Sequence, residues 1–543
     1  MAYNDDEPTA PTSTGPATAR PMGITGLPAR QVQLTKYHNP VASLAPNDQE
    51  VLLELKGSSS TERAGLDLIA VIDVSGSMSG DGLSKVKAAL HFVIRKLSDL
   101  DRLCIVTFSK YATRVCPLRF VTDDLRVGLR TLVDGLVASG LTNIKAGLET
   151  GLGVIDGRRL TAGRAVNVKL MSDGEQNEGG DARDVDLKNV PVYTFGFGAG
   201  HNPNLMEAIV RKSLGGTINY VADGANLTGP FSQLLGGLLT IIAQDVQLTV
   251  TRASTPAGDG SSITVTFGTL YSAEVRRVIV YLALDDKTGS RPYDAKVLMA
   301  QYRFTFQAQQ VNSNPDVITI HRRWSAPAPD AARRAQVETE LARRQHAELI
   351  RAARARAEAN DMENARRKLK EAQKALEDNP DLQAAVNPTA GMLMEELRQL
   401  RALMEKGLYD KQGHPYAASS LASHEHDRQR AATRGKADGG VGLFNTPRME
   451  TYIEQAKQFD NNPQARCHFP EPEVVEVPPP VPAEPEVPPE VPRDMVAGDR
   501  RTLSVVLRVA TAVLCLVAFV LMASGSARAS ADDSYGHYDQ YSP

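Results

Sequence analysis

The strongest hydrophobic pattern in the chain is a series of short apolar runs that alternate with amphipathic segments between residues 63 and 245. The runs are rich in Val, Ile and Leu, as buried parallel strands are, and the segments between them repeat apolar residues every three or four positions. This alternation predicts a doubly wound, mostly parallel sheet with helices on both faces, a Rossmann-like α/β fold. The strand-like runs are 68–72, 103–108, 166–171 and 192–195, and the helical patterns include 85–97, 124–136, 144–155 and 204–214.

The pattern changes twice after this α/β region. Residues 246–326 alternate apolar and polar side chains with a period of two, which predicts a small antiparallel β-sandwich. Residues 31–62 contain two similar stretches, and we expect them to complete this sandwich. Trp324, the one tryptophan, is expected in its core. Residues 327–408 return to helical spacing, which predicts a helical region of two or three packed helices.

Segments of low apolar content lie at the start of the chain and after the helical region. Residues 1–30 are rich in Pro, Thr, Ala and Gly, which predicts a disordered leader. Residues 409–502 are predicted to be mostly disordered, with an extended acidic spacer rich in Pro and Val from residue 470. Three of the four histidines in this segment cluster near its start, and without a nearby cysteine these three are expected in a polar loop rather than a zinc site. They are His414, His424 and His426.

Residues 503–523 are apolar except for Arg508 and a few small polar side chains. A stretch of about 20 such residues is long enough to cross the hydrocarbon core of a bilayer. The sequence therefore predicts one C-terminal transmembrane helix, followed by a short tail at 524–543. Three arginines precede the run and no secretory signal is visible at the N-terminus, so a single-pass anchor with cytosolic N-terminal domains is expected.

This apolar segment also carries a local resemblance. Residues 507–520 resemble the first span of Casparian-strip-like membrane proteins, but the other three spans of that family are absent. The alternative to a membrane anchor is therefore a mis-joined gene model, which would leave the protein in the cytosol.

Composition narrows the classes of function. The 61 basic and 64 acidic residues nearly balance, and Glu interrupts the Arg-rich stretch at 351–367, as on a solvated helix face. Nucleic acid is therefore not an expected partner. The four cysteines are scattered and form neither a CxxC pair nor a disulfide framework, which is typical of a reducing compartment.

Oxygen-bearing side chains gather at the ends of two of the predicted strands. Asp73, Ser75 and Ser77 follow the first run, Asp173 follows the third, and Thr142 lies in a Gly-containing turn before a helix. Each residue alone is explained by helix capping or turn formation. Because ligands of open α/β sheets bind at the carboxyl ends of strands, we expect these five side chains to lie together. Hard oxygen ligands suit Mg²⁺.

This set of five residues resembles the metal-ion-dependent adhesion site of the von Willebrand factor type A domain, and the resemblance covers about residues 63–245. It implies that Ser75 and Ser77 contact Mg²⁺ or Mn²⁺ directly, while Asp73 and Asp173 act largely through bound water. It further implies that an Asp or Glu of a partner protein fills the open metal position. No nucleophile with a positioned base accompanies the set, so metal-dependent protein binding without catalysis is expected.

The order of the regions resembles a plant group that includes wavy-growth-type ubiquitin ligases. Residues 419–435 and 442–452 also resemble the tail of plant members. Those ligases carry a RING finger ahead of the type A domain, whereas this chain has no cysteine before Cys104 and thus no RING finger is expected. The alternative function is a non-catalytic adaptor or regulatory subunit of a plant ubiquitin ligase complex, paired with RING-bearing relatives.

Overall fold

The computed structural model describes most of the chain between residues 31 and 462. The predicted leader (apart from Asp5), the Pro-rich spacer and the tail at 524–543 lie outside the described residues. The described residues are 5, 31–60, 62–198, 200, 202–221, 227–253, 261–328, 330–382, 387–428, 432–433, 442–462 and 505–510.

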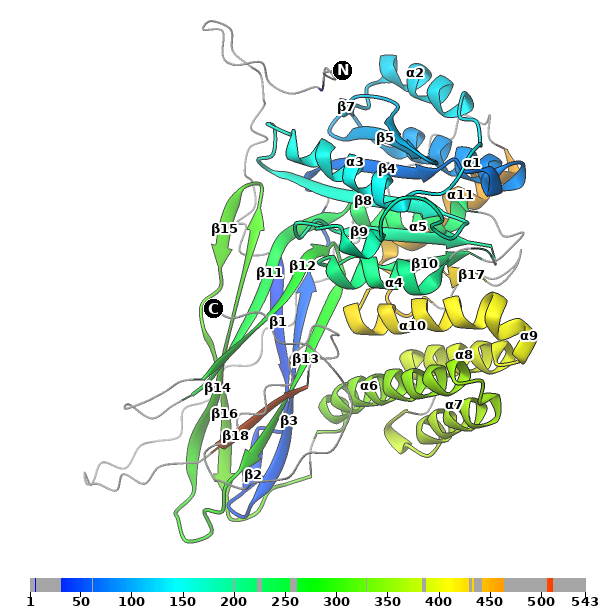
Figure 1. Cartoon of the computed structure of the whole chain (residues 1–543). Helices are drawn as coiled ribbons and strands as arrows, with labels where there is room; N and C mark the ends of the chain where they lie inside the picture. The colour runs from blue at the N-terminus through cyan, green and yellow to red at the C-terminus, as the bar shows by residue number, and fades with distance from the viewer. Residues whose placement is uncertain are drawn as a thin grey trace, which may run out of the picture.

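A largely parallel sheet forms the centre of the α/β domain (Figure 1). Its strand order is β17-β10-β9-β8-β4-β5-β6, with β7 also paired to β5, and only β6 and β7 run antiparallel to their neighbour. The chain passes from β4 to β5 on one side and later to β8 on the other, so the carboxyl end of β4 is a switch point of the winding. The strands are β4 (Gly65–Asp73), β5 (Arg102–Phe108), β6 (Ala112–Arg114), β7 (Arg119–Phe120), β8 (Arg164–Ser172), β9 (Val192–Phe197), β10 (Ile218–Val221) and β17 (Ala432–Thr433).

Helices cover both faces of this sheet, which confirms the predicted α/β fold. One face packs against α1, α2 and α5, and the other packs against α3 and α4, each through a continuous apolar cluster. A 3₁₀ turn (Gly76–Met78) connects β4 to α1. The helices are α1 (Asp81–Lys96), α2 (Asp123–Asp134), α3 (Ile144–Asp156), α4 (Pro203–Lys212) and α5 (Thr228–Leu238).

A β-sandwich built from two sheets adjoins the α/β domain (Figure 1). One sheet has the order β1-β3-β13-β18, and the other has the order β12-β11-β14-β16-β2 with β15 paired to β14. Strands that precede the α/β domain thus pair with strands that follow it. The bounds are β1 (Val32–Tyr37), β2 (Val41–Ser43), β3 (Asn47–Gly57), β11 (Ile241–Arg252), β12 (Ser262–Tyr271), β13 (Val275–Leu284), β14 (Tyr293–Phe306), β15 (Gln309–Asn312), β16 (Asp316–Arg323) and β18 (Val505–Ala510).

Two predictions for the sandwich and the C-terminal segment are wrong. Trp324 is 67% exposed and does not enter the core. Within the segment predicted to span a membrane, residues 505–510 form strand β18, which pairs antiparallel with β13. In the described part of the chain, no helix is long and apolar enough to cross a membrane, so the predicted single-pass anchor is not supported. The physical reason is that an apolar run rich in Val also suits a sheet strand, and hydropathy alone does not separate the two.

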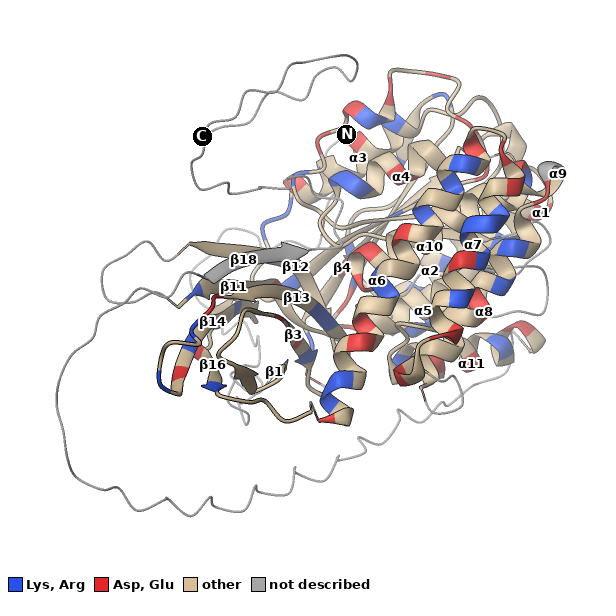
Figure 2. Cartoon of the chain, turned by 90° about the horizontal axis from the view of Figure 1, so that it is seen from below, with Lys and Arg blue, Asp and Glu red and all other residues tan. Residues whose placement is uncertain are grey.

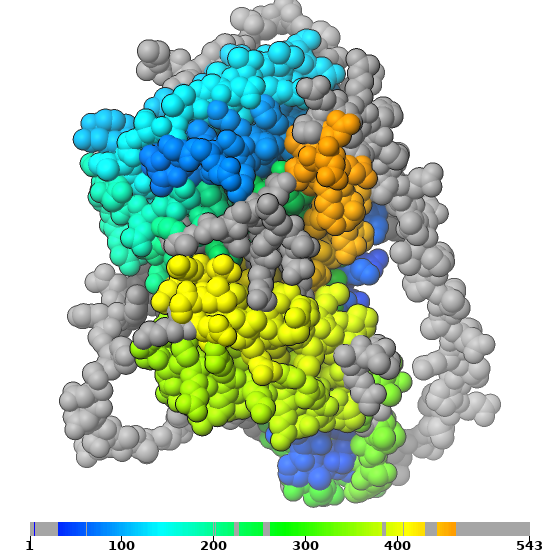
Figure 3. Space-filling model, turned by 90° about the vertical axis from the view of Figure 1, so that its right-hand side faces the viewer, coloured from blue at the N-terminus to red at the C-terminus, as the bar shows by residue number. Residues whose placement is uncertain are grey.

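The helical region packs against the edge of the α/β sheet. Helix α10 contacts β10 and α4 on one side and α6 on the other, and Figure 3 shows this yellow segment directly below the α/β domain. In Figure 2, basic residues (blue) and acidic residues (red) are interspersed along the ribbons of α6, α7 and α8. The bounds are α6 (Ala331–Glu358), α7 (Met362–Glu377), α8 (Pro388–Leu403), α9 (Lys406–Leu408), a π-helical turn (Tyr409–Gly413), α10 (His414–His426) and α11 (Pro447–Asn461).

The structure differs from the predicted disorder of residues 409–502, because α10 and α11 lie there. Helix α11 packs on α5, and its buried residues join the core of the α/β domain. The ring of Phe459 lies edge-on to Phe92 of α1, with 5.6 Å between centroids. The three histidines expected in a polar loop belong to α10, and burial lowers the pKa of both His424 and His426 to about 4.

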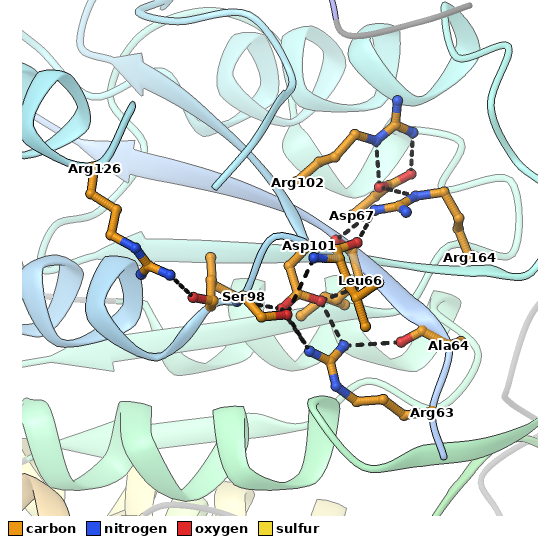
Figure 4. Close-up of polar contacts among 11 residues, drawn as sticks. Arg63, Ala64, Leu66, Asp67, Ser98, Asp101, Arg102, Arg126 and Arg164 are labelled. Carbon is orange, nitrogen blue, oxygen red and sulfur yellow. Dashed lines mark hydrogen bonds and ion pairs between the residues drawn. The ribbon is translucent and has the colours of Figure 1, made fainter. Parts of the chain in front are cut away.

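A buried carboxylate stabilises the amino end of the central strand β4. Asp67 receives hydrogen bonds of 2.6–2.8 Å from Arg102, Arg158 and Arg164, and Figure 4 shows two of these guanidinium groups around it. Burial by itself would raise the pKa of Asp67, but the three arginines outweigh burial and the pKa is lowered. Next to it, Arg63 holds the buried Asp101 in the same way. These ion pairs fix the amino end of β4 relative to its neighbouring strands.

We expect Asp67→Ala to lower the free energy of unfolding by about 3–5 kcal/mol, since the substitution leaves buried arginines without their carboxylate. Asp123→Ala is the matched control, because Asp123 pairs with Arg126 at the surface and exposed pairs contribute less than about 1 kcal/mol. Urea denaturation of the full chain measures both. Equal losses in the two variants would contradict the role given to Asp67.

Lys169 is a buried lysine on β8, and its Nζ has no hydrogen-bond partner within the described residues. The Nζ lies 5.0 Å from the centroid of the Phe231 ring. Burial lowers the pKa of Lys169 to about 7. An unfolded lysine has a pKa of about 10.4, so between these values the unfolded chain holds a proton that the folded chain has lost. This contribution to stability therefore increases as the pH rises from 7 towards 10.

Lys169→Met should make the folded chain more stable than the wild type at pH 7, and the difference should shrink as the pH approaches 9.5. The reason is that the wild type must release the proton of Lys169 when it folds, and the free-energy cost of this release falls as the pH approaches the unfolded pKa of about 10.4. Urea denaturation across this pH range tests the expectation, with Lys56→Met at an exposed position of β3 as the control. A difference that stays constant with pH would show that Lys169 keeps its charge state on folding.

Candidate functional site

Asp73 ends strand β4 at the switch point of the sheet, and its side chain is buried. One carboxylate oxygen accepts a hydrogen bond from the backbone N–H of Ser75 at 2.8 Å, and the other accepts from Oγ of Ser172 at 2.5 Å. Burial raises the pKa of Asp73, although these hydrogen bonds act in the opposite direction. Two neighbouring parallel strands, β4 and β8, therefore fix the orientation of this carboxylate.

The hydroxyl groups of Ser75 and Ser77 lie side by side in the turn after β4. Their Oγ atoms are 3.0 Å apart, and Oγ of Ser77 donates a hydrogen bond to the carboxylate of Asp173 at 2.8 Å. The N–H of Gly76 donates to the carbonyl of Gly140 at 3.0 Å, which ties this turn to the loop before α3. Ser75 is buried whereas Ser77 is exposed, so the cluster reaches the surface at Ser77.

Thr142 reaches the same place from the loop before α3. Its backbone N–H donates to the side-chain oxygen of Asn177 at 2.8 Å, and its carbonyl accepts from the N–H of Asn177 at 3.0 Å. A Cβ atom placed on Gly174 would lie 3.3 Å from Oγ of Ser77 and 3.5 Å from Oγ1 of Thr142. The absence of a side chain at Gly174 therefore keeps the space beside both hydroxyls open.

The structure thus brings all five residues singled out by the sequence together at the carboxyl ends of the sheet strands. Sequence reasoning missed the residues that hold them, namely Ser172 and Asn177. A hydroxyl directly before Asp173 at the end of an apolar run was an available signal for Ser172. Asn177 gave no signal, because its contact with Thr142 joins loops that are 35 residues apart.

Exposed apolar side chains lie on the loops beside this cluster. Tyr111, in the turn between β5 and β6, is 74% exposed, and Leu141, directly before Thr142, is 42% exposed. Hydrogen bonds join the two loops, since the N–H of Asn143 donates to the carbonyl of Ser109 at 2.9 Å. A ligand bound at Ser77 can therefore make apolar contacts as well as polar ones.

The two ends of β4 differ in how their buried carboxylates are compensated. Asp67 is surrounded by three arginines, whereas the hydrogen-bond donors to Asp73 within the described part of the chain come from two serines. A buried carboxylate that lacks a cationic partner is energetically unfavourable. The carboxyl end of β4 is therefore the end at which a bound cation would be stabilising.

The donor set fits a small hard cation. It consists of carboxylates and hydroxyls, the ligand types that Mg²⁺ prefers. Neighbouring ligands in an octahedron around Mg²⁺ lie about 2.9 Å apart, given metal–oxygen distances of about 2.0–2.1 Å. The 3.0 Å separation between the Oγ atoms of Ser75 and Ser77 is close to that spacing.

Comparison with known families matches two parts of the chain. Residues 67–233 match the family described as von Willebrand factor type A domain. Residues 387–458 match the family described as VWA / Hh protein intein-like, a range that includes α8, α10 and most of α11.

Comparison with individual proteins gives matches over part of the chain. The chain is 28% identical over 266 residues to the E3 ubiquitin-protein ligase WAV3 of Arabidopsis thaliana, covering 43% of this chain and 33% of that protein. It is 30% identical over 199 residues to an uncharacterized protein of Synechocystis, covering 35% of this chain and 46% of that protein. The chain thus spans between a third and a half of the length of these relatives.

One solved structure shares the fold over most of the chain. It is a von Willebrand factor type A protein from Catenulispora acidiphila, with a TM-score of 0.52 and 17% sequence identity. The likeness covers 73% of this chain and 96% of that one, so it extends beyond the α/β domain.

Proposed function

We propose that the von Willebrand factor type A domain of this chain binds a partner protein through Mg²⁺ or Mn²⁺ held by Asp73, Ser75, Ser77, Thr142 and Asp173. The observation that carries this proposal is the hydrogen-bonded series from Asp73 through the two serines to Asp173 at the switch point of the sheet. The presence of the domain is shown by the family match, whereas the metal and the partner are our inference.

In this proposal the hydroxyl residues contact the ion directly, and the carboxylate residues supply most of the negative charge. Ser75, Ser77 and Thr142 offer neutral hydroxyls to the ion, while Asp73 and Asp173 act mainly through water and hydrogen bonds. The bound ion would keep a net attraction for one further carboxylate, which an exposed Asp or Glu of the partner supplies. Tyr111 and Leu141 would pack beside that carboxylate and contribute to the choice of partner.

A second candidate function rests on the similarity to a ubiquitin ligase. WAV3 is named an E3 ubiquitin-protein ligase, but the similarity covers only 33% of its length. We propose as the alternative that this chain is a non-catalytic adaptor or regulatory subunit of such a ligase complex. Autoubiquitination by the purified chain, with a conjugating enzyme and no added ligase, would argue against it.

Asp73→Ala should weaken binding of Mn²⁺ by about 10–100-fold, the usual effect of losing a residue that orients metal ligands. Isothermal titration calorimetry of the full chain measures this change. Asp81→Ala is the matched control, because Asp81 lies in the first turn of α1 with an exposed side chain. Unchanged Mn²⁺ affinity in Asp73→Ala, with Asp81→Ala also unchanged, would refute the assigned site.

The second expectation concerns the partner. Binding of a partner should require Mg²⁺, and it should be lost in Asp73→Ala and after substitution of a single Asp or Glu on the partner. Pull-downs with the full chain in Mg²⁺ and in chelator identify candidate partners, and biolayer interferometry with the purified partner tests the acidic residue. Circular dichroism should show that the fold survives chelation, since the site lies at the edge of the sheet. A partner that binds equally well in chelator would contradict the mechanism.

A further inference from the structure

A second polar cluster lies inside the helical region, where three helices meet. His346 on α6 and His424 on α10 both direct Nε2 at the same carboxylate oxygen of Glu396 on α8, at 2.9 and 2.7 Å. The candidate ligand atoms of the three side chains lie within 4.8 Å of one another. All three side chains are at most 4% exposed. Residues from three separate helices therefore converge on one point that solvent does not reach.

The chemistry of this cluster is that of a zinc ligand set. Two imidazoles and one carboxylate bind Zn²⁺ in many proteins. Neither Nδ1 atom has a hydrogen-bond partner within the described residues. Each Nδ1 can therefore carry the ring proton. In that tautomer, the lone pair of Nε2 is available to a cation.

The charges around Glu396 also favour a cation. The nearby guanidinium of Arg343 is bonded to Glu340 and Asp427 at 2.6–2.8 Å, and Arg344 is bonded to Glu340 at 2.9 Å, so these two arginines are matched by two carboxylates other than Glu396. The other oxygen of Glu396 accepts a hydrogen bond from the hydroxyl of Ser420, one turn before His424 on α10. Arg343 also donates to the backbone carbonyl of His424 at 2.8 Å, which fixes the end of α10 beside the cluster.

We propose that His346, Glu396 and His424 form a Zn²⁺ site that links α6, α8 and α10. Ligand atoms around a tetrahedral zinc ion lie about 3.3 Å apart. Each histidine nitrogen therefore needs to move away from the Glu396 oxygen by only about half an ångström, while the two nitrogens, which lie within 4.8 Å of each other, adopt that same spacing. Three protein ligands leave one position of the ion for a water molecule. The other two histidines of α10 lie outside this site. His414 contacts Glu358 and Arg354 instead, and His426 is not among the residues whose ligand atoms converge here.

The role that follows from this position is structural. Helix α10 lies between the helical region and the α/β sheet, and the hydroxyl of Ser419 donates to the carbonyl of Ile218 on β10 at 3.1 Å. An ion that joins α10 to α6 and α8 would hold the helical region against the edge of that sheet. The site is distinct from the one at the carboxyl end of β4, to which it contributes no residue.

The test uses the full chain carrying Asp73→Ala and Ser75→Ala, so that the other candidate site does not contribute. After stripping with a chelator, the protein is titrated with CoCl₂ and, separately, loaded with ZnCl₂ and dialysed. We expect the visible absorption bands of tetrahedral Co²⁺ and one zinc per chain by mass spectrometry. Adding His346→Gln and His424→Gln should abolish both signals, whereas His414→Gln, on the same helix, should keep them.

If the histidine variants do not fold, the temperature of unfolding provides a second measurement. Zinc that binds only the native state must raise the temperature of unfolding of the chain that carries intact histidines. Retention of the Co²⁺ bands without His346 and His424 would overturn the proposal. So would the absence of these bands, or of any zinc-dependent rise in unfolding temperature, in the chain with intact histidines.

Discussion

Strand β4 carries a buried carboxylate near each end, and the structure around it depends on how these two charges are compensated. At the amino end, Asp67 is neutralised by three arginines drawn from β5, β8 and the segment after α3. At the carboxyl end, Asp73 is held by serine donors, and its pKa is raised rather than lowered. The first arrangement compensates the buried charge within the chain, without a ligand. The second leaves a negative charge for which a bound cation is the natural partner.

The surrounding domains leave that second end accessible. The amino end of β4 adjoins the β-sandwich, since the N–H of Ala64 donates to the carbonyl of Ile241 at the start of β11. The helical region covers the β10 edge of the sheet, and α11 covers α5. These contacts lie away from the turn at Ser77, which remains exposed. The candidate site therefore lies at the surface, on loops that also carry the exposed side chains of Tyr111 and Leu141.

The sequence predicted those parts of the molecule whose signal is local. Alternating apolar and amphipathic segments identified the α/β fold. Serines and aspartates at strand ends, with Thr142 in the loop before α3, singled out five residues that the structure brings close together. Supporting contacts made by Ser172 and Asn177 were not predicted, because they depend on which loops meet. The same limit applies to His346, Glu396 and His424, which are 50 and 28 residues apart along the chain and are joined only by the packing of three helices.

The incorrect predictions concern segments whose amino-acid composition is compatible with more than one structure. A Val-rich apolar run suits both a spanning helix and a sheet strand, and residues 505–510 form a strand. Polar composition suggested disorder around α11, yet Met449, Tyr452, Ala456 and Phe459 recur at helical spacing and complete an apolar core that the α/β domain leaves open. Trp324 lies at the end of the sandwich, where no second layer covers it within the described residues. An apolar side chain alone therefore did not indicate a place in the core.

The most direct test of the metal site is a crystal structure of the full chain grown with MnCl₂ and measured at a wavelength where manganese scatters anomalously. We expect one anomalous peak within bonding distance of the Oγ atoms of Ser75 and Ser77. A well-ordered crystal with saturating Mn²⁺ and no peak between these two hydroxyls would contradict it.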